Sequence, residues 1–356
     1  MSDNACAEKP LISVVIPVYN GREYLREALQ SIQRQTWRRL EILVLDDGSS
    51  DDSWRLIEEA AERDRRIIPI RNGKNRGLIW TLNRGLEMAT GDFIARMDAD
   101  DISLPERFER QIAYMERERL DFCGTWIELL GPSRKRLIRY PTNDFLFRVG
   151  LLFQTPFSHP TLMMKRHVLD GGVRYREVAR HAEEYDLALR LARNFRMGNL
   201  PEVQLKYRVH SSQVSKVYRK EQLETAAAIR RKALDLFDIV ADDRERELHG
   251  LVRYPLPVES LERLRDFRNW LERLAAHFDG NDEAQKLVTE QWFRLCVRAS
   301  GLGPRVFGEY RKFRYQDKYP RNMRQQLDLF VSTLLHLRYG GRFYGFLERF
   351  SFTSSL

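Results

Sequence analysis

The sequence predicts an α/β protein built on a mostly parallel, doubly wound sheet and followed by a helical C-terminal region. Short aliphatic runs alternate with amphipathic segments four times within about the first hundred residues. This alternation is typical of βαβ units, in which each helix returns the chain across the sheet. From about residue 221 the segments are mainly long, charged and amphipathic. We therefore expect two domains, residues 1–220 and 221–356.

The first strand is predicted at residues 11–18 (LISVVIPV), an uninterrupted apolar run that suits a strand buried on both faces. A helix with one apolar face should follow it, because apolar residues then recur at helical spacing. The later elements are predicted from the same two patterns, apolar runs for strands and helical spacing of apolar residues for helices. Strands are expected at 41–45, 67–70, 92–97, within 120–130, 161–165 and 203–209, and helices at 22–34, from 51, 78–89, from 103 and 183–195.

The composition is that of a globular protein, with its excess positive charge near the C-terminus. Of 356 residues, 43% are hydrophobic, which excludes disorder of the whole chain. Residues 303–356 hold ten Lys/Arg against four Asp/Glu, so they carry +6 of the net charge of +9. Two main interpretations stay open for this region: a helix packed on the first domain, or an anchor on an anionic membrane surface, with nucleic acid as a weaker third option. The apolar face in question comprises Met323, Leu327, Phe330, Leu334 and Leu337.

The sequence predicts a cytoplasmic protein, either free or peripheral on the inner face of the cell membrane. Its first ten residues are polar and unlike a signal peptide, and it contains no apolar run of about 18 residues. The three cysteines, Cys6, Cys123 and Cys296, are too scattered for a disulfide framework or a metal-binding motif. No nucleic-acid-binding motif is present, so we expect no nucleic-acid partner.

Polar residues follow three of the predicted parallel strands, at the strand ends where α/β sheets bind ligands. They are residues 19–20, 46–47 and 98–101. The last group, Asp-Ala-Asp-Asp, offers the oxygen ligands that Mg²⁺ or Mn²⁺ prefers. Each group alone also fits an ordinary turn or helix cap, but three together favour a binding site. Because no glycine-rich phosphate loop is present, a bound nucleotide would need metal and side chains to hold its phosphates.

These motifs and their order resemble the family 2 inverting glycosyltransferases, which have a GT-A fold. The resemblance covers about residues 11–216. It is carried by SVVIPVYN, EILVLDDGSSD, NRGLIWTLNRGLEMATGDFIARMDADD and LPERFERQ, then by HPTLMMKR, AEEYDLALRL and YRVHSSQVS. It implies an enzyme that moves a sugar from a nucleotide sugar, most simply a UDP-sugar, to a glycan or lipid-linked acceptor.

The resemblance implies nucleotide and metal roles for residues at the strand ends. Asp47 would contact the base, with Asp46 beside it. Asp100 would be the direct ligand of Mn²⁺ or Mg²⁺, and Asp98 would lie near the ribose or the sugar. His210 is a further candidate for contact with metal or phosphate, against a purely structural histidine. Arg208 is expected to assist by pairing with phosphate. The other implied contacts to the nucleotide sugar are Pro17, Val18, Tyr19, Asn20, Arg76, Asn83 and Ala99.

The resemblance also implies a catalytic base at the start of the helix at 183–195. An acidic Glu-Asp pair usually opens this helix in the family, and here the pair is Glu183-Glu184. Glu184 thus takes the position of the base, with one more methylene than the usual Asp. Since attack distances are near 3 Å, that difference keeps Glu183 and Asp186 as alternatives. One base and one metal suffice for a single displacement with inversion.

Two other functions are weighed against this one. A nucleotidyltransferase on a similar sheet would need a glycine- and arginine-rich loop after the first strand, and residues 17–22 (PVYNGR) do not provide it. A non-catalytic scaffold that binds nucleotide sugars is the other alternative. Glu184, in place of the usual Asp, is the feature that points to it.

Overall fold

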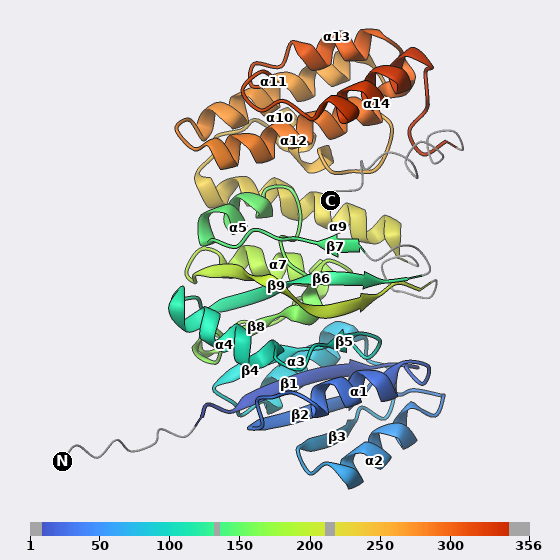
Figure 1. The fold of residues 1–356 in the computed structure, drawn as a ribbon, viewed down its shortest axis with the longest axis vertical. Coiled ribbons are helices and arrows are strands. Elements are labelled where there is room, and N and C mark those ends of the chain that lie inside the picture. The colour runs from blue at the N-terminus through green and yellow to red at the C-terminus, as the bar shows by residue number, and fades with distance from the viewer. Residues whose placement is uncertain (1–8, 132–135, 211–217, 342–356) are drawn as a thin grey trace, which may run out of the picture. The chain divides into compact units, whose positions relative to one another are not determined.

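The computed structural model describes residues 9–131, 136–210 and 218–341 of the chain. The chain divides into two compact units, Met1–Arg148 with Thr155–Gln222 and Val149–Gln154 with Leu223–Leu356. The first is an α/β unit, and the described part of the second is helical (Figure 1). The predicted fold class is therefore confirmed. Within the described residues, no helix combines the length and the apolar character needed to cross a bilayer.

Nine strands of the described chain form one sheet in the order β3-β2-β1-β4-β8-β6-β9-β5, with β7 paired to β6. Its first four strands are all parallel, as predicted, whereas β8 is antiparallel to both of its neighbours. The parallel group comprises β1 (Ile12–Val18), β2 (Leu40–Asp46), β3 (Ile67–Arg71) and β4 (Phe93–Arg96). The others are β5 (Ile102–Ser103), β6 (Phe122–Leu130), β7 (Arg136–Ile138), β8 (Met163–Lys165) and β9 (Met197–Arg208).

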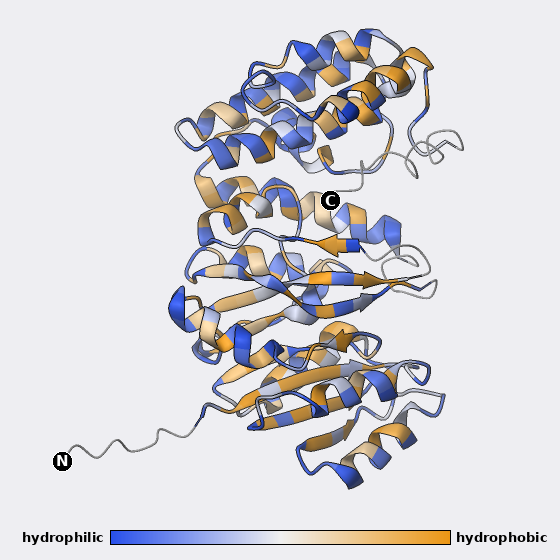
Figure 2. Cartoon of the chain, in the orientation of Figure 1, coloured by the Kyte–Doolittle hydropathy of each residue, from blue (hydrophilic) through white to orange (hydrophobic). Residues whose placement is uncertain are grey.

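Helices cover both faces of the parallel strands, which explains why β1 is buried along its whole length and is almost entirely apolar (Figure 2). Alternate residues of β1, such as Val14 and Ile16, belong to a core shared with α1 (Leu25–Gln33), α2 (Ser53–Arg63) and α4 (Arg107–Arg117). On the other face lies α3 (Leu78–Met88). A Cβ atom on its Gly85 would stand 2.5 Å from Cγ1 of Val15, so the close approach of α3 requires a glycine.

The structure differs from the sequence prediction around residue 103, where a helix was expected to begin. Ser103 instead belongs to β5 and pairs with Leu205 of β9, and the Leu104 amide donates to the Gln204 carbonyl at 2.9 Å. These sheet hydrogen bonds delay the start of α4 to Arg107. Two further short helices are α5 (Asp144–Leu151) and α6 (His167–Asp170). The helix predicted at 183–195 is present as α7 (Glu183–Leu191), which ends four residues before the predicted end.

The second unit contains helices that begin at recognisable cap residues. The side chains of Asp242, Ser260, Asn281 and Asn322 each accept a hydrogen bond from a backbone N–H of the first turn. Its core includes the fully buried Trp292. The helices are α9 (Arg219–Ala233), which spans the boundary between the units, α10 (Asp243–Leu251), α11 (Leu261–His277), α12 (Asp282–Arg298), α13 (Arg305–Arg311) and α14 (Met323–Leu334).

Candidate active site

The ends of β2 and β4 flank the end of β1, so the polar segments that follow them meet at one edge of the sheet. The Asp47 amide donates to the Val18 carbonyl at 2.8 Å, and the Met97 amide donates to the Val15 carbonyl at 3.1 Å. The loop after β1 also reaches the acidic segment, because a Cβ on Gly21 would lie 3.6 Å from the Cβ of Ala99. The predicted convergence of residues 19–20, 46–47 and 98–101 is thus present.

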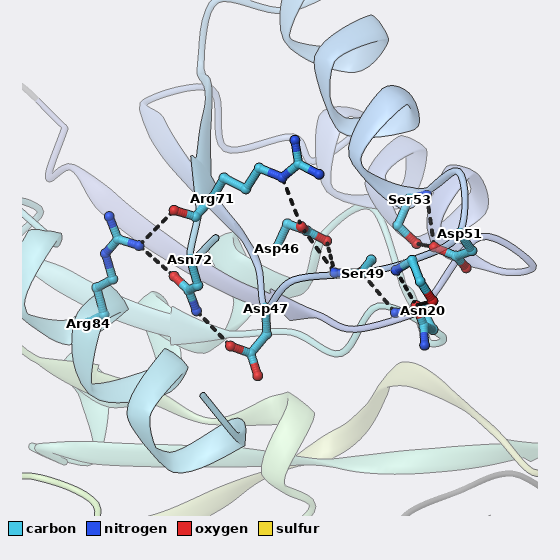
Figure 3. A network of polar contacts seen from close by, with 10 residues as sticks. Asn20, Asp46, Asp47, Ser49, Asp51, Ser53, Arg71, Asn72 and Arg84 are labelled. Atoms are coloured by element: carbon cyan, nitrogen blue, oxygen red, sulfur yellow. Dashed lines mark hydrogen bonds and ion pairs between the residues drawn. The ribbon is translucent and has the colours of Figure 1, made fainter. Parts of the chain in front are cut away.

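Asp47 fixes the loop formed by residues 72–77 (Figure 3). Its Oδ1 accepts hydrogen bonds from Nδ2 of Asn72 and from the Arg76 amide, both at 2.9 Å, and its Oδ2 accepts from the Gly77 amide at 2.8 Å. The carboxylate is buried, at 4% exposure. In this structure the residue predicted to contact a base therefore holds the backbone that carries Arg76, whose guanidinium lies over the exposed Trp80 ring.

Asp46 and Asn20 join the loops that follow β2 and β1 (Figure 3). Both oxygens of Asp46 lie near the Ser49 amide, at 3.3 and 3.4 Å, while the Ser49 hydroxyl accepts from the Asn20 amide at 2.9 Å. Asn20 has a φ of 49°, which asparagine tolerates better than most residues. This arrangement leaves Tyr19 54% exposed at the edge of the sheet, whereas the preceding Pro17 and Val18 are buried.

Asp98 is paired with an arginine that the sequence analysis did not single out. Arg96, the last residue of β4, contacts both oxygens of the Asp98 carboxylate, with 2.8 Å between Nη1 and Oδ2. The guanidinium is buried, and its Nε has no hydrogen-bond partner among the described residues. A second unpredicted arginine, the fully buried Arg107, donates to the Arg96 carbonyl at 2.9 Å. Burial lowers the pKa of Arg107 to about 9.

Asp100 contacts His210, the residue that follows β9 by two positions. Nε2 of His210 lies 2.9 Å from Oδ2 of Asp100. Arg208 donates from Nε to the Asp100 carbonyl at 2.8 Å, donates to Glu27 and lies over the Tyr24 ring. Arg208 therefore positions the acidic segment in this structure, and its pairing with phosphate stays a prediction. Residues 211–216 of the same motif lie outside the described part of the chain.

The acidic segment has the donor atoms of a cation site. Asp98, Asp100 and Asp101 each place one carboxylate oxygen within 4.8 Å of the other two. Asp101 is buried, and its Oδ2 has no hydrogen-bond partner among the described residues. Burial and the charges of Asp98 and Asp100 raise the pKa of Asp101 well above its usual range. A bound cation would relieve this repulsion.

Glu183 and Glu184 occupy the first turn of α7, close enough to Arg96 and Asp98 for their charges to interact. Burial, followed by the neighbouring Glu183 charge, raises the pKa of Glu184 to about 8. Burial also raises the pKa of Glu183. Both carboxyl groups have an atom within 4.8 Å of a ring nitrogen of His159. The acidic residues that follow β4 and those that open α7 are far apart in the sequence, but they lie close enough for their charges to interact.

His159 and Asp186 complete the surroundings of this pair. Burial lowers the pKa of His159 well below its usual value, so its ring is neutral, and its Nε2 lies 2.9 Å from the Tyr175 hydroxyl. Asp186 binds two arginines, with Arg190 Nε at 2.9 Å and Arg176 Nε at 3.0 Å from Oδ2. Its carboxylate is therefore committed to ion pairs, in contrast to the glutamates.

Asn83 contacts protein backbone in this structure. Its Nδ2 donates to the Tyr175 carbonyl and its Oδ1 accepts from the Tyr175 amide, both at 2.9 Å. These two hydrogen bonds fix the backbone of Tyr175, whose hydroxyl contacts His159. Sequence reasoning missed Arg96 and Tyr175. For Arg96 a signal was available, because an arginine inside an apolar strand needs a carboxylate partner when it is buried.

Comparison with known proteins agrees with this geometry. Residues 13–171 match the model of the family described as "Glycosyl transferase family 2". A Haemophilus influenzae protein described as an uncharacterized glycosyltransferase is 34% identical over 240 residues, which span 64% of this chain and 74% of that protein. The O-antigen biosynthesis glycosyltransferase WbnJ of Escherichia coli is 31% identical over 220 residues, covering 58% of this chain and 82% of WbnJ. The chain therefore belongs to glycosyl transferase family 2, as the sequence motifs predicted.

A solved structure supports the fold independently. The crystal structure of residues 1–349 of Staphylococcus aureus TarS, in complex with UDP-GlcNAc, aligns with a TM-score of 0.56. The alignment covers 90% of this chain and 91% of that chain at 17% sequence identity. At this identity the likeness concerns the fold alone.

Proposed function

We propose that the protein is an inverting, metal-dependent glycosyltransferase that transfers a sugar from a UDP-sugar to a hydroxyl of a glycan or lipid-linked acceptor. The proposal rests on one observation: the carboxylates that follow β4 and those that open α7 lie close enough to Arg96 for their charges to interact with it. The donor is supported by TarS, which binds UDP-GlcNAc in its crystal structure. The acceptor class is supported by WbnJ and by AmsE of Erwinia amylovora, described as O-antigen and amylovoran biosynthesis glycosyltransferases.

Asp100 and His210 are the residues that we expect to hold Mn²⁺ or Mg²⁺. The oxygen-rich cluster fits such a hard cation, and the buried Asp101 offers an Oδ2 atom that has no hydrogen-bond partner among the described residues. Asp98 is a weaker candidate ligand, because Arg96 engages both of its oxygens. When bound, the cation would stabilise the negative charge of the departing diphosphate.

Glu184 is the carboxylate that best fits the catalytic base. It is partly exposed, whereas Glu183 is buried and Asp186 is bound by two arginines. A pKa near 8 makes it a stronger base than an ordinary glutamate. Glu184 would take the proton of the acceptor hydroxyl as that oxygen bonds to the anomeric carbon. The bond from this carbon to the diphosphate oxygen breaks at the same time, which inverts the configuration.

Donor hydrolysis by the full chain tests this function. A panel of nucleotide sugars would be incubated with Mn²⁺, with Mg²⁺ and with a chelator, and the released nucleoside diphosphate measured. We expect release from a UDP-sugar only with a cation, and its loss in Asp100→Asn. Asp170→Asn is the matched control, since Asp170 is exposed on α6. Consumption of a nucleoside triphosphate would indicate a nucleotidyltransferase, and UDP binding without any turnover would indicate a scaffold.

We further propose that the enzyme acts in the cytoplasm. The two cysteines within the described residues, Cys123 and Cys296, are buried free thiols, which suits a reducing compartment. Treatment of the native protein with a thiol reagent should therefore leave both unmodified.

A further inference from the structure

We propose that one face of α14 is a docking surface for an anionic lipid membrane. The apolar side chains of this face are exposed: Met323 by 86%, Leu327 by 57%, Phe330 by 41% and Leu334 by 52%. Their spacings of four, three and four residues place them along a single stripe of the helix. Soluble proteins seldom leave several large apolar side chains together on the surface, and such a patch usually marks an interaction site.

The rest of α14 explains why this stripe faces outward. Leu329, Ser332 and Thr333 are buried and attach the helix to its own unit through its other side. The helix also has its own N-cap, since Asn322 Oδ1 accepts from the Gln325 amide at 2.9 Å. The fold therefore fixes the orientation of α14 without a partner. Among the described residues, the Phe307 ring of α13 covers part of this stripe. Its centroid lies 5.2 Å from that of the Phe330 ring.

The charge around the stripe points to an anionic partner. Residues 303–341 contain eight Lys/Arg and three Asp/Glu. Of the acidic residues, Glu309 is buried and bound by Arg265, Arg268 and Lys312, so it contributes little surface charge. The basic residues at the surface of this segment include Arg305, Arg311, Arg314, Arg324 and Arg338.

Apolar side chains beside arginines are the pattern of a helix that lies in the membrane interface. The apolar side chains enter the boundary of the acyl chains, and the arginines meet the anionic headgroups. A second copy of the chain is a poorer fit, because a symmetric contact would bring this basic patch, which includes Arg324, against the identical patch of the other copy. None of these residues is part of the candidate active site, and the inference does not depend on the proposed function.

Vesicle flotation of the full chain tests this proposal. Vesicles of phosphatidylcholine mixed with phosphatidylglycerol are compared with vesicles of phosphatidylcholine alone. We expect the wild type to float with the anionic vesicles and not with the neutral ones. Leu327→Glu with Phe330→Glu should weaken binding by more than about tenfold, and each of Arg324→Gln and Arg338→Gln by about fivefold. Val240→Glu is the matched control, because Val240 is 87% exposed in the same unit and lies outside α14.

Melting curves establish whether each variant folds, and the milder Leu327→Gln replaces the double variant if that one unfolds. Flotation of Leu327→Gln equal to that of wild type would overturn the proposal. So would a wild type that does not float with anionic vesicles. A wild-type dimer that Leu327→Gln dissociates, in a protein that binds no vesicles, would assign the surface to a second copy instead.

Discussion

The pH dependence of catalysis should report the environment of Glu184. Since burial and the Glu183 charge raise the pKa of Glu184 to about 8, the base is mostly protonated at neutral pH. About a tenth of it is ionised at pH 7 and about nine tenths at pH 9, so kcat/KM should rise about tenfold between them. An ordinary glutamate, with a pKa of about 4.3, would give no rise in this range.

Two neutral variants separate the causes of this shift. Glu184→Gln removes the base, so we expect kcat to fall by about 10²–10⁴ and the rise with pH to disappear. Glu183→Gln removes the neighbouring negative charge, so the rise should move to lower pH while most of the activity is kept. Because the two carboxyl groups interact, the midpoint in the wild type belongs to the pair.

Initial rates of donor hydrolysis, measured from neutral to alkaline pH at fixed Mn²⁺, give the three profiles. A wild-type profile that is flat above about pH 6 would refute the reasoning about burial. The opposite result would assign the base to Glu183: a large loss of activity in Glu183→Gln, with the activity of Glu184→Gln unchanged.

Three further predictions concern stability. Asp47→Ala removes the acceptor of three N–H groups, so the free energy of unfolding in urea should fall by about 1–3 kcal/mol, and an unchanged midpoint would contradict this. Arg96→Met leaves the Asp98 carboxylate without its cation and should cost about 2–4 kcal/mol, part of which Asp98→Asn should restore in the double variant. Glu184→Gln should melt higher than wild type at about pH 9 and similarly at about pH 4, because the raised pKa makes the wild type lose stability as pH rises through this window.

The sequence was most informative where one physical pattern determines the structure. Buried parallel strands must be apolar on both faces, so β1 and β2 were predicted to within one residue at each end. Parallel strands also align their carboxyl ends, which predicted Asp47 and residues 98–101 at one edge of the sheet. Glu184 was found through the family motif, and its proximity to Asp98 is a result of the structure.

Contacts between distant segments have no such pattern in the sequence. The pair of Asp100 with His210 joins residues 110 positions apart, and Asn83 meets Tyr175 across 92 positions. β5 was missed because two residues are too few to show a period, and its pairing depends on β9. α5 was missed because its sequence, DFLFRVGL, is short and mostly apolar and fits a strand equally well.

Calorimetric titration with UDP, with and without Mn²⁺, tests most directly whether Asp100 and Glu184 have separate roles in one active site. We expect UDP to bind wild type and Glu184→Gln with equal affinity in the presence of Mn²⁺, and to bind Asp100→Asn at least about tenfold more weakly. Donor hydrolysis should be lost in both variants. Equal UDP affinity of all three proteins, unaffected by Mn²⁺, would contradict the assignment of Asp100 to the cation and the diphosphate.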